Sequence, residues 1–355
     1  MKNNSKANFV SAFTISNFFV GLFVGAGFMS GQELWQYFGK YKLFGVIFLI
    51  FGSFLQGFLG YFIAKKAREK GVYHFDVLPC KNNLFLRRTF IVTEAIFMLF
   101  TASIMIAGAN SLYESIFLKN GFWFSLLFTI TVSITAYFGI DGVVTIFKIV
   151  MPILLTISAI IFIETIKTPF LNFEIAFTKI LPKEFLSALY ACVIYIFHNV
   201  YLSLALLVPF SKKIQNYKTG LKGFFLSSVT FLLFSLFVLT PIMLNQHYAN
   251  YALPLLELSK TISPFIFYIF AFFLCVAMYL SCLSSSVAVI DALYNKNKPF
   301  LKNKPLIIML CALCSFLLSR VGFKALIAVM YPICGYLGII FIIRLVFCSY
   351  SAKIK

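Results

Sequence analysis

The chain has 355 residues, of which 61% are hydrophobic and only 12% are charged. About a quarter of the residues in a soluble globular domain are charged, so this composition excludes a mostly water-soluble chain and favours one that lies in lipid. The net charge of +19 is spread over short segments, and no long basic run exists that would bind a nucleic acid.

Ten apolar runs approach or exceed the roughly 20 residues that a helix needs to cross a bilayer. Proline, glycine and clustered charges separate them. They cover residues 9–38, 42–64, 89–112, 121–138, 141–164, 185–208, 220–245, 262–291, 305–319 and 323–347. We therefore predict an all-α integral membrane protein with one transmembrane domain over residues 1–355. No small-residue cleavage site follows the first run, so we expect the N-terminus to be retained.

The first run is interrupted by the segment Gly25-Ala26-Gly27-Phe28-Met29-Ser30-Gly31, which leads into Gln32 and Glu33. Each glycine lowers helix propensity by about 1 kcal/mol and lets the backbone unwind. Unwinding would free the amides from Phe28 to Gly31, at the positive end of the following half-helix, to bind a solute carboxylate. The alternative is close helix packing through small residues. Glu33 would gate, bind an amine or face water.

The third and fifth runs each contain an ionisable residue that is a candidate for function. Glu94 lies early in the third run, on its predicted cytoplasmic side, and is open to either a functional or a structural interpretation. Lys148 precedes Pro152 by four residues and would either extend to the membrane surface or, as a buried amine, exchange the proton that couples transport.

The sixth run carries His198 and Asn199 at its centre, with Tyr195 and Tyr201 nearby. Polar groups at mid-membrane normally face a cavity or a partner, so we predict that His198 and Asn199 contact the solute. His198 would be a proton relay or a hydrogen-bonded interior residue.

The eighth run carries Ser281, Ser284, Ser285 and Ser286. Their hydroxyls would coordinate a hard cation, or they would donate to the carbonyls of their own helix. In the ninth run, Cys311 and Cys314 form a CxxC that lacks the further ligands of a zinc site, so we expect no metal or redox cofactor there.

Lysine and arginine accumulate in cytoplasmic loops, so their distribution predicts the orientation. With the N-terminus inside, the inner segments hold twenty of these residues and the outer segments nine. We therefore predict ten spans in the cell membrane with both termini in the cytoplasm. The ten helices divide into two halves, about 9–164 and 185–347, as in transporters built from inverted repeats whose discontinuous helices bind the solute.

The stretch from Val24 to Glu33 resembles the first-helix signature of the YkvI-like membrane proteins, which are related to the amino acid-polyamine-organocation transporters. The resemblance extends to Met105-Ile106-Ala107-Gly108 in the third run and to the ten spans. It implies a LeuT-type fold of two inverted five-helix repeats with broken helices one and six. It also implies a solute site between these two helices, with Met105 nearby.

Leu283-Ser284-Ser285-Ser286-Val287-Ala288 resembles the sodium-binding stretch of neurotransmitter:sodium symporters. The resemblance implies a sodium ion held by the hydroxyls of Ser284 and Ser285 and by the carbonyls of Gly21, Val24 and Ser281. Residues 139–141 and 148–152 resemble the start of the symporter fifth helix, which favours a structural Lys148. No substrate-selecting motif of a characterised amino acid transporter is recognisable.

These features together predict a secondary transporter, not an enzyme, that moves a small amino-acid-like solute and is coupled to sodium or protons. A membrane-embedded enzyme acting on lipid substrates is one alternative, although His198, Glu33 and Glu94 are scattered over several depths. A ligand sensor on a transporter fold is another. No Walker-type GxxxxGK[ST] run is present, so ATP-driven pumping is not expected. The oligomeric state is left open.

Overall fold

The computed structural model describes residues 10–79, 83–138, 143–167, 182–294 and 302–351. Within these ranges the chain is helical, apart from turns and one isolated β-bridge between Val10 and Ile214. The α-helices are α1 (Ala12–Gly21), α2 (Ala26–Met29), α3 (Gln32–Tyr37), α4 (Lys42–Lys70), α5 (Leu84–Phe117), α6 (Phe122–Phe138), α7 (Val143–Lys167), α9 (Pro182–Phe210), α10 (Tyr217–Leu244), α11 (Pro254–Ile262), α12 (Pro264–Leu293), α13 (Lys304–Ser319) and α14 (Phe323–Ser351). All ten predicted runs coincide with helices.

Six of these segments are long and apolar enough to cross a membrane by length and composition: Gln32–Lys70, Leu84–Phe117, Glu184–Lys213, Tyr217–Leu244, Pro264–Ile290 and Phe323–Phe347. α1, α6 and α13 are shorter apolar helices. Large apolar side chains such as Phe51, Trp123 and Phe272 are more than half exposed on helix surfaces. Such surfaces require lipid, because water would not tolerate so much contiguous apolar area. The protein is a multi-pass, all-helical membrane protein.

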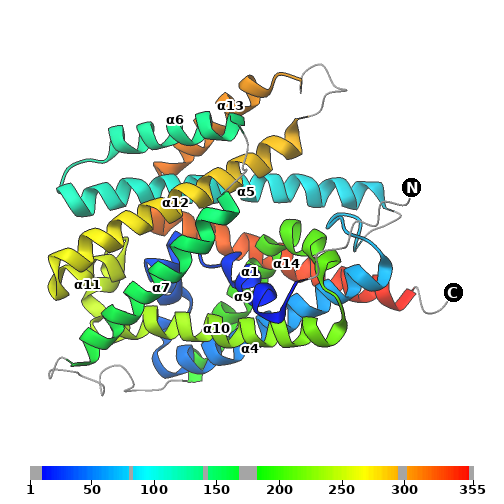
Figure 1. The fold of residues 1–355 in the computed structure, drawn as a ribbon, viewed down its shortest axis with the longest axis horizontal. Helices are drawn as coiled ribbons and strands as arrows, with labels where there is room; N and C mark the ends of the chain where they lie inside the picture. The colour runs from blue at the N-terminus through cyan, green and yellow to red at the C-terminus, as the bar shows by residue number, and fades with distance from the viewer. Residues whose placement is uncertain (1–9, 80–82, 139–142, 168–181, 295–301, 352–355) are drawn as a thin grey trace.

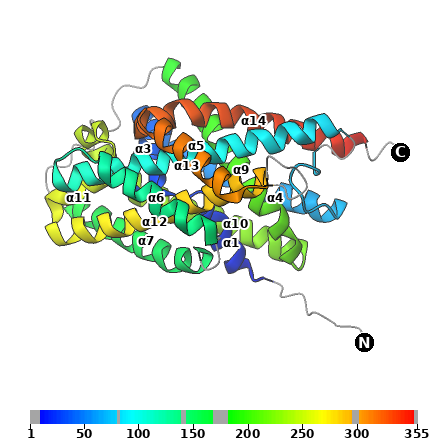
Figure 2. The ribbon, with the colours of Figure 1, turned by 90° about the horizontal axis from the view of Figure 1, so that it is seen from above.

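The helices lie largely alongside one another (Figures 1 and 2). In Figure 1, α6 and α13 pack together along one flank against α5 and α12. α4 and α10 pack together on the opposite flank, with α1 against α10 and α9 against α4. α14 packs along α9 and also contacts α5. Buried apolar side chains from all of these helices form one continuous core.

The first predicted run is broken as expected. α1 ends at Gly21, and the next amides donate to carbonyls three and two residues back, from Leu22 to Phe19 and from Gly25 to Phe23. A second bend follows α2 at Gly31, whose φ of 83° lies in the left-handed region that favours glycine. A Cβ at this position would also collide with the side chain of Ile242. The prediction of a broken first helix is confirmed.

The prediction of a broken sixth helix is wrong. α9 runs without interruption from Pro182 to Phe210 and passes through His198 and Asn199. The polar side chains favour unwinding, but the segment 185–208 contains no glycine to lower its helix propensity. Both side chains are buried between helices instead, so their polarity is accommodated without loss of backbone hydrogen bonds.

The distribution of lysine and arginine assigns the end of α4 and the connection between α9 and α10 to the same side of the membrane. The structure places both at the same end of the molecule. Arg68, at the end of α4, donates to the Gln215 carbonyl at 2.9 Å in the connection between α9 and α10. At the other end, Lys260 of α11 donates to the Ser115 carbonyl at 2.8 Å. α5 joins the two ends with 34 residues, or about 50 Å, which exceeds the hydrocarbon thickness. Which end faces the cytoplasm stays a prediction.

Candidate functional site

Glu33 on α3 is the centre of the candidate site. Its side chain is buried, and the Tyr331 hydroxyl from α14 donates a short hydrogen bond to Oε1. The Tyr195 hydroxyl from α9 donates to Oε2 at 3.4 Å. No ion pair among the described residues includes this carboxylate. A carboxylate inside a membrane normally has a charged partner, so Glu33 is placed to receive a cation or a proton.

The bend in the first helix determines where Glu33 lies. Its carboxylate folds back over Gly27 so closely that a Cβ built on Gly27 would overlap the carboxylate oxygen. The Ser30 hydroxyl fixes the bend by donating to the Gly27 carbonyl at 2.9 Å and accepting from the Gln32 amide at 3.3 Å. Gly27 therefore serves the site by leaving space for the carboxylate.

Tyr195 and Tyr331 contact this carboxylate, and the rings of Tyr37 and His198 pack on these two tyrosines. We call the four residues the aromatic box. The Tyr37 ring lies 5.4 Å from that of Tyr195 and 5.8 Å from that of Tyr331. His198 stacks on Tyr331 with the ring centroids 3.7 Å apart. Aromatic faces next to a carboxylate suit an ammonium group, because ring quadrupoles and the negative charge both attract cations.

Two of the four amides that were predicted to be free are hydrogen-bonded within the broken segment. The Met29 amide donates to the Gly25 carbonyl at 3.0 Å, and the Gly31 amide donates to the Phe28 carbonyl at 2.9 Å. These short-range bonds satisfy the Met29 and Gly31 amides locally, so these two amides are not available to a solute in this structure. The polar group that the bend presents is the Glu33 side chain.

The other predicted solute contacts lie at buried positions, and their contact with a solute stays a prediction. Phe28 and Met29 are fully buried, and the Phe28 ring lies 5.3 Å from that of Phe231. Met105 is buried on α5. Asn199 donates to Gln56 Oε1 on α4 at 3.3 Å. The side chains of Ala26 and Lys148 lie outside the described part of the structure.

α11 covers the broken helix from the end of the molecule that carries Lys260. The Leu255 amide donates to the Ser30 carbonyl at 2.9 Å, and Leu255 is fully buried. The hydrogen bond between Lys260 and the Ser115 carbonyl attaches α11 to α5. A solute can reach Glu33 from this end only if α11 moves.

The structure places one serine of α12, which is the eighth predicted run, next to the break in the first helix. A Cβ built on Gly25 would lie 4.0 Å from Ser281 Oγ, so this hydroxyl faces the broken segment. Ser285, one turn later, is buried on the same helix. The Ser284 hydroxyl donates to the Leu280 carbonyl of its own helix at 2.8 Å.

The backbone partners implied for a sodium ion lie in the same region. Gly21 is the last residue of α1, and Val24 lies in the break. In the implied set, Ser281 contributes a carbonyl and Ser284 a hydroxyl. The observed geometry instead favours the Ser281 hydroxyl, because it is the one next to Gly25.

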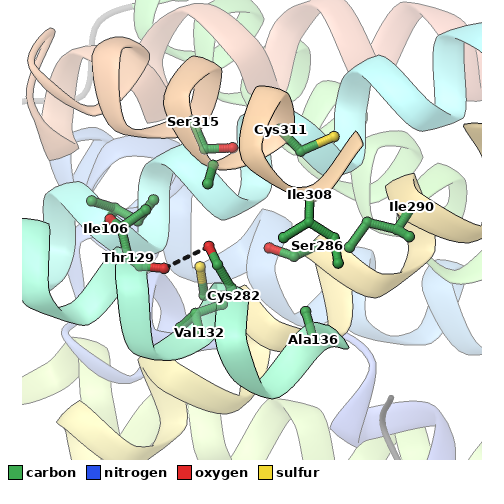
Figure 3. Close-up of a pocket in the computed structure, with 12 residues that line it drawn as sticks. Ile106, Thr129, Val132, Ala136, Cys282, Ser286, Ile290, Ile308, Cys311 and Ser315 are labelled. Atoms are coloured by element: carbon green, nitrogen blue, oxygen red, sulfur yellow. Dashed lines mark hydrogen bonds between the residues drawn. The ribbon is translucent and has the colours of Figure 1, made fainter. Parts of the chain in front are cut away.

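A small cavity lies elsewhere, between α5, α6, α12 and α13 (Figure 3). Its volume of about 10 Å³ has room for one water molecule at most. Ser286 and Cys282 line it together with Thr129, whose carbonyl accepts from Ser133 at 2.7 Å. The cavity is too small for an amino acid, so we do not assign the solute to it.

Sequence reasoning missed two members of the aromatic box, Tyr37 and Tyr331. Tyr331 is separated from Glu33 by almost the whole chain and precedes Pro332 in an apolar run. A tyrosine hydroxyl at membrane depth needs a partner, which was the available signal. The identity of that partner required the packing of α14 against α3 and α9.

The chain is similar along nearly its full length to two uncharacterised proteins of Bacillus subtilis (strain 168). It is 26% identical to the membrane protein YkvI over 94% of both chains, and 23% identical to YyaD over 95% of this chain and 96% of YyaD. The resemblance inferred from the first-helix motif is thereby confirmed. No protein-family model matches the chain.

The fold is that of a membrane transporter of known structure. The crystal structure of the Eremococcus coleocola manganese transporter in complex with an aromatic bis-isothiourea substituted compound matches with a TM-score of 0.58 and 14% identity. The match covers 94% of this chain and 78% of the transporter. A mutant of the same transporter matches with a TM-score of 0.54 and 13% identity, over 97% and 80% of the two chains.

Proposed function

We propose that the protein is a secondary active transporter of a small, amino-acid-like solute, coupled to a cation gradient across the cell membrane. The observation that carries the proposal is the buried Glu33 carboxylate, which has no cationic partner among the described residues and lies beside a broken helix. The solute ammonium would pair with Glu33 and lie against the aromatic box. The transporter fold of the structural neighbours supports this function.

The packing of the helices supports two inverted repeats, 9–164 and 185–347. In such a repeat each membrane span of the first half has a counterpart five spans later in the second half. A contact between two spans should therefore recur between their two counterparts. α1 packs on α10 as α9 packs on α4, and α5 packs on α13 as α12 packs on α6. Likewise α5 packs on α14 as α12 packs on α7. These reciprocal pairs favour ten spans in a LeuT-like arrangement, and the distribution of lysine and arginine favours cytoplasmic termini.

Alternating access would give the solute its route. Glu33 is enclosed by α9 and α14 and covered by α11, so binding and release require these elements to separate in turn from the broken helix. Rocking of one helix bundle against the other around a midplane site has this effect. The coupling ion would be sodium near Ser281 and Ser285, or a proton.

The chemistry of the box favours an organic cation over a metal ion as cargo. The structural neighbour is described as a manganese transporter, and manganese prefers several oxygen ligands in octahedral geometry. The Glu33 site consists of one carboxylate and aromatic rings. Such a site fits an ammonium group better.

A thermal-shift screen of amino acids and amines, each with and without sodium, tests the proposal, since a ligand that binds the native state raises its apparent stability. Each hit would then be measured for uptake into proteoliposomes. We expect saturable uptake that Glu33→Gln abolishes and Glu114→Gln, a change at an exposed position on α5, leaves intact. Binding without flux would favour a sensor, and conversion of a lipid substrate would favour an enzyme. Either result would overturn transport.

A further inference from the structure

A second buried carboxylate, Glu94 on α5, has no role in the Glu33 site. Its side chain is only 5% exposed, and neither carboxylate oxygen has a hydrogen-bond partner among the described residues. None of the ion pairs found there includes it. Glu33 differs, because two tyrosine hydroxyls hold it. A bare carboxylate at this depth calls for a function that uses its charge.

The surroundings of Glu94 select the proton among the possible cations. Phe90 and Phe97 flank it along the same face of α5, and both rings are buried. Glu94 lies close enough to Tyr201 of α9 and to Cys334 of α14 to act on both electrostatically. A hard metal ion such as calcium takes six to eight oxygen ligands, which two phenylalanine rings, one tyrosine hydroxyl and a thiol do not supply. A proton needs only the carboxylate.

Glu94 and Glu33 lie along the same interface, formed by α9 and α14. On α9, Tyr195 contacts Glu33 and Tyr201 faces Glu94, six residues or about 9 Å further along the helix. His198 lies between them on the same face, and its Nδ1 has no partner among the described residues.

The second helix of the interface, α14, repeats this arrangement. Tyr331 binds Glu33, and Cys334, one turn later, faces Glu94. Tyr201 is held in place by a hydrogen bond of 2.6 Å between its hydroxyl and that of Thr93 on α5. Any movement of α9 and α14 that follows solute binding at Glu33 therefore also changes the environment of Glu94.

We propose that Glu94 carries the proton whose movement drives solute transport. This inference rests on the proposed function and names its coupling ion. While α9 and α14 cover Glu94, the neutral acid is the stable form, because a bare buried carboxylate is costly in a membrane. When the interface opens to water, the O–H bond of the acid breaks, the proton passes to a water molecule and the carboxylate remains. Opening on the other side reverses the reaction.

The test combines spectroscopy with transport in proteoliposomes that contain the full chain. Infrared difference spectra of wild type and Glu94→Gln at neutral pH report whether Glu94 is a protonated acid, without any solute. Uptake of a radiolabelled mixture of the common amino acids is then measured with and without an imposed pH gradient. Exchange of the same mixture across the membrane is measured without a gradient.

We expect the carbonyl band of a protonated acid in wild type to be missing in Glu94→Gln. We also expect that variant to exchange solute but to lose all accumulation driven by the pH gradient, while Glu94→Asp regains it. Absence of the band, or undiminished pH-driven accumulation in Glu94→Gln, would overturn the proposal. If wild type neither exchanges nor accumulates, the proposed function fails, whereas the infrared result still decides the state of Glu94. Glu94→Asp provides the comparison if Glu94→Gln does not fold.

Discussion

The Glu33 carboxylate lies so close to Gly27 that it occupies the space that a side chain at position 27 would need. The contact exists because the chain turns at Ser30 and Gly31 and brings α3 back against α2. Gly31 is thus required because of its left-handed backbone conformation. Gly27 is required because the Glu33 side chain occupies the space next to it.

Substitution of Gly27 should therefore abolish solute binding without preventing membrane insertion. In Gly27→Ala the new methyl group displaces the Glu33 carboxylate, and in Gly27→Leu the displacement is larger. Gly220→Ala is the matched control, because a Cβ there would lie 3.4 Å from Ile214, an ordinary contact distance. Uptake in proteoliposomes and the thermal shift with the best ligand measure the effect. Normal uptake by Gly27→Leu would contradict the placement of the solute at Glu33.

Removal of the Tyr331 hydroxyl should weaken binding, while removal of the Tyr336 hydroxyl on the same helix should not. Tyr331 donates to the buried Glu33, whereas the Tyr336 hydroxyl is exposed and hydrogen-bonded to that of Tyr190 at 2.7 Å. A hydrogen bond to a charged group contributes about 1.5–3 kcal/mol, so Kd should rise by roughly 10- to 100-fold in Tyr331→Phe. Equal affinities of Tyr331→Phe and Tyr336→Phe would show that the hydroxyl does not position Glu33 for binding.

If sodium binds at the break, Ser285→Ala should weaken the sodium dependence of uptake, and Ser281→Ala should do so as well because its hydroxyl faces Gly25. Ser235→Ala on α10 is the control, since that buried hydroxyl donates to the Phe231 carbonyl at 2.8 Å. The measurement is the sodium concentration that gives half-maximal uptake. If this sodium concentration is unchanged in both Ser281→Ala and Ser285→Ala, the proton is favoured as the coupling ion.

Loss of the Lys260 side chain should loosen α11 and expose the broken helix. Lys260 donates to the Ser115 carbonyl and pairs with Glu257, both at 2.8 Å. In a Ser30→Cys background we expect Lys260→Ala to increase the rate of labelling by a membrane-impermeant thiol reagent, because Ser30 is fully buried under α11. Lys119→Ala, at an exposed position after α5, is the control. Labelling as slow as in the parent would show that α11 does not cover the site.

Much of the fold could be predicted from the sequence, since membrane helices are encoded by local composition. The apolar runs predicted the helices, and the glycines from Gly25 to Gly31 predicted the break. Both predictions succeed because hydrophobicity and helix propensity depend on residues that are neighbours in sequence. The same reasoning failed at His198, where polar side chains in a segment without glycine left α9 intact.

Sequence alone determined that this chain lies in a membrane, where its helices run and where the first of them breaks. Only the tertiary structure decided what surrounds Glu33 and Glu94. Tyr195 and Tyr331 reach Glu33 from helices distant in sequence, and Glu94 has no hydrogen-bond partner within the part of the chain that the structure describes. Hydrophobicity is a property of each residue, whereas the partner of a buried charge depends on which helices pack together.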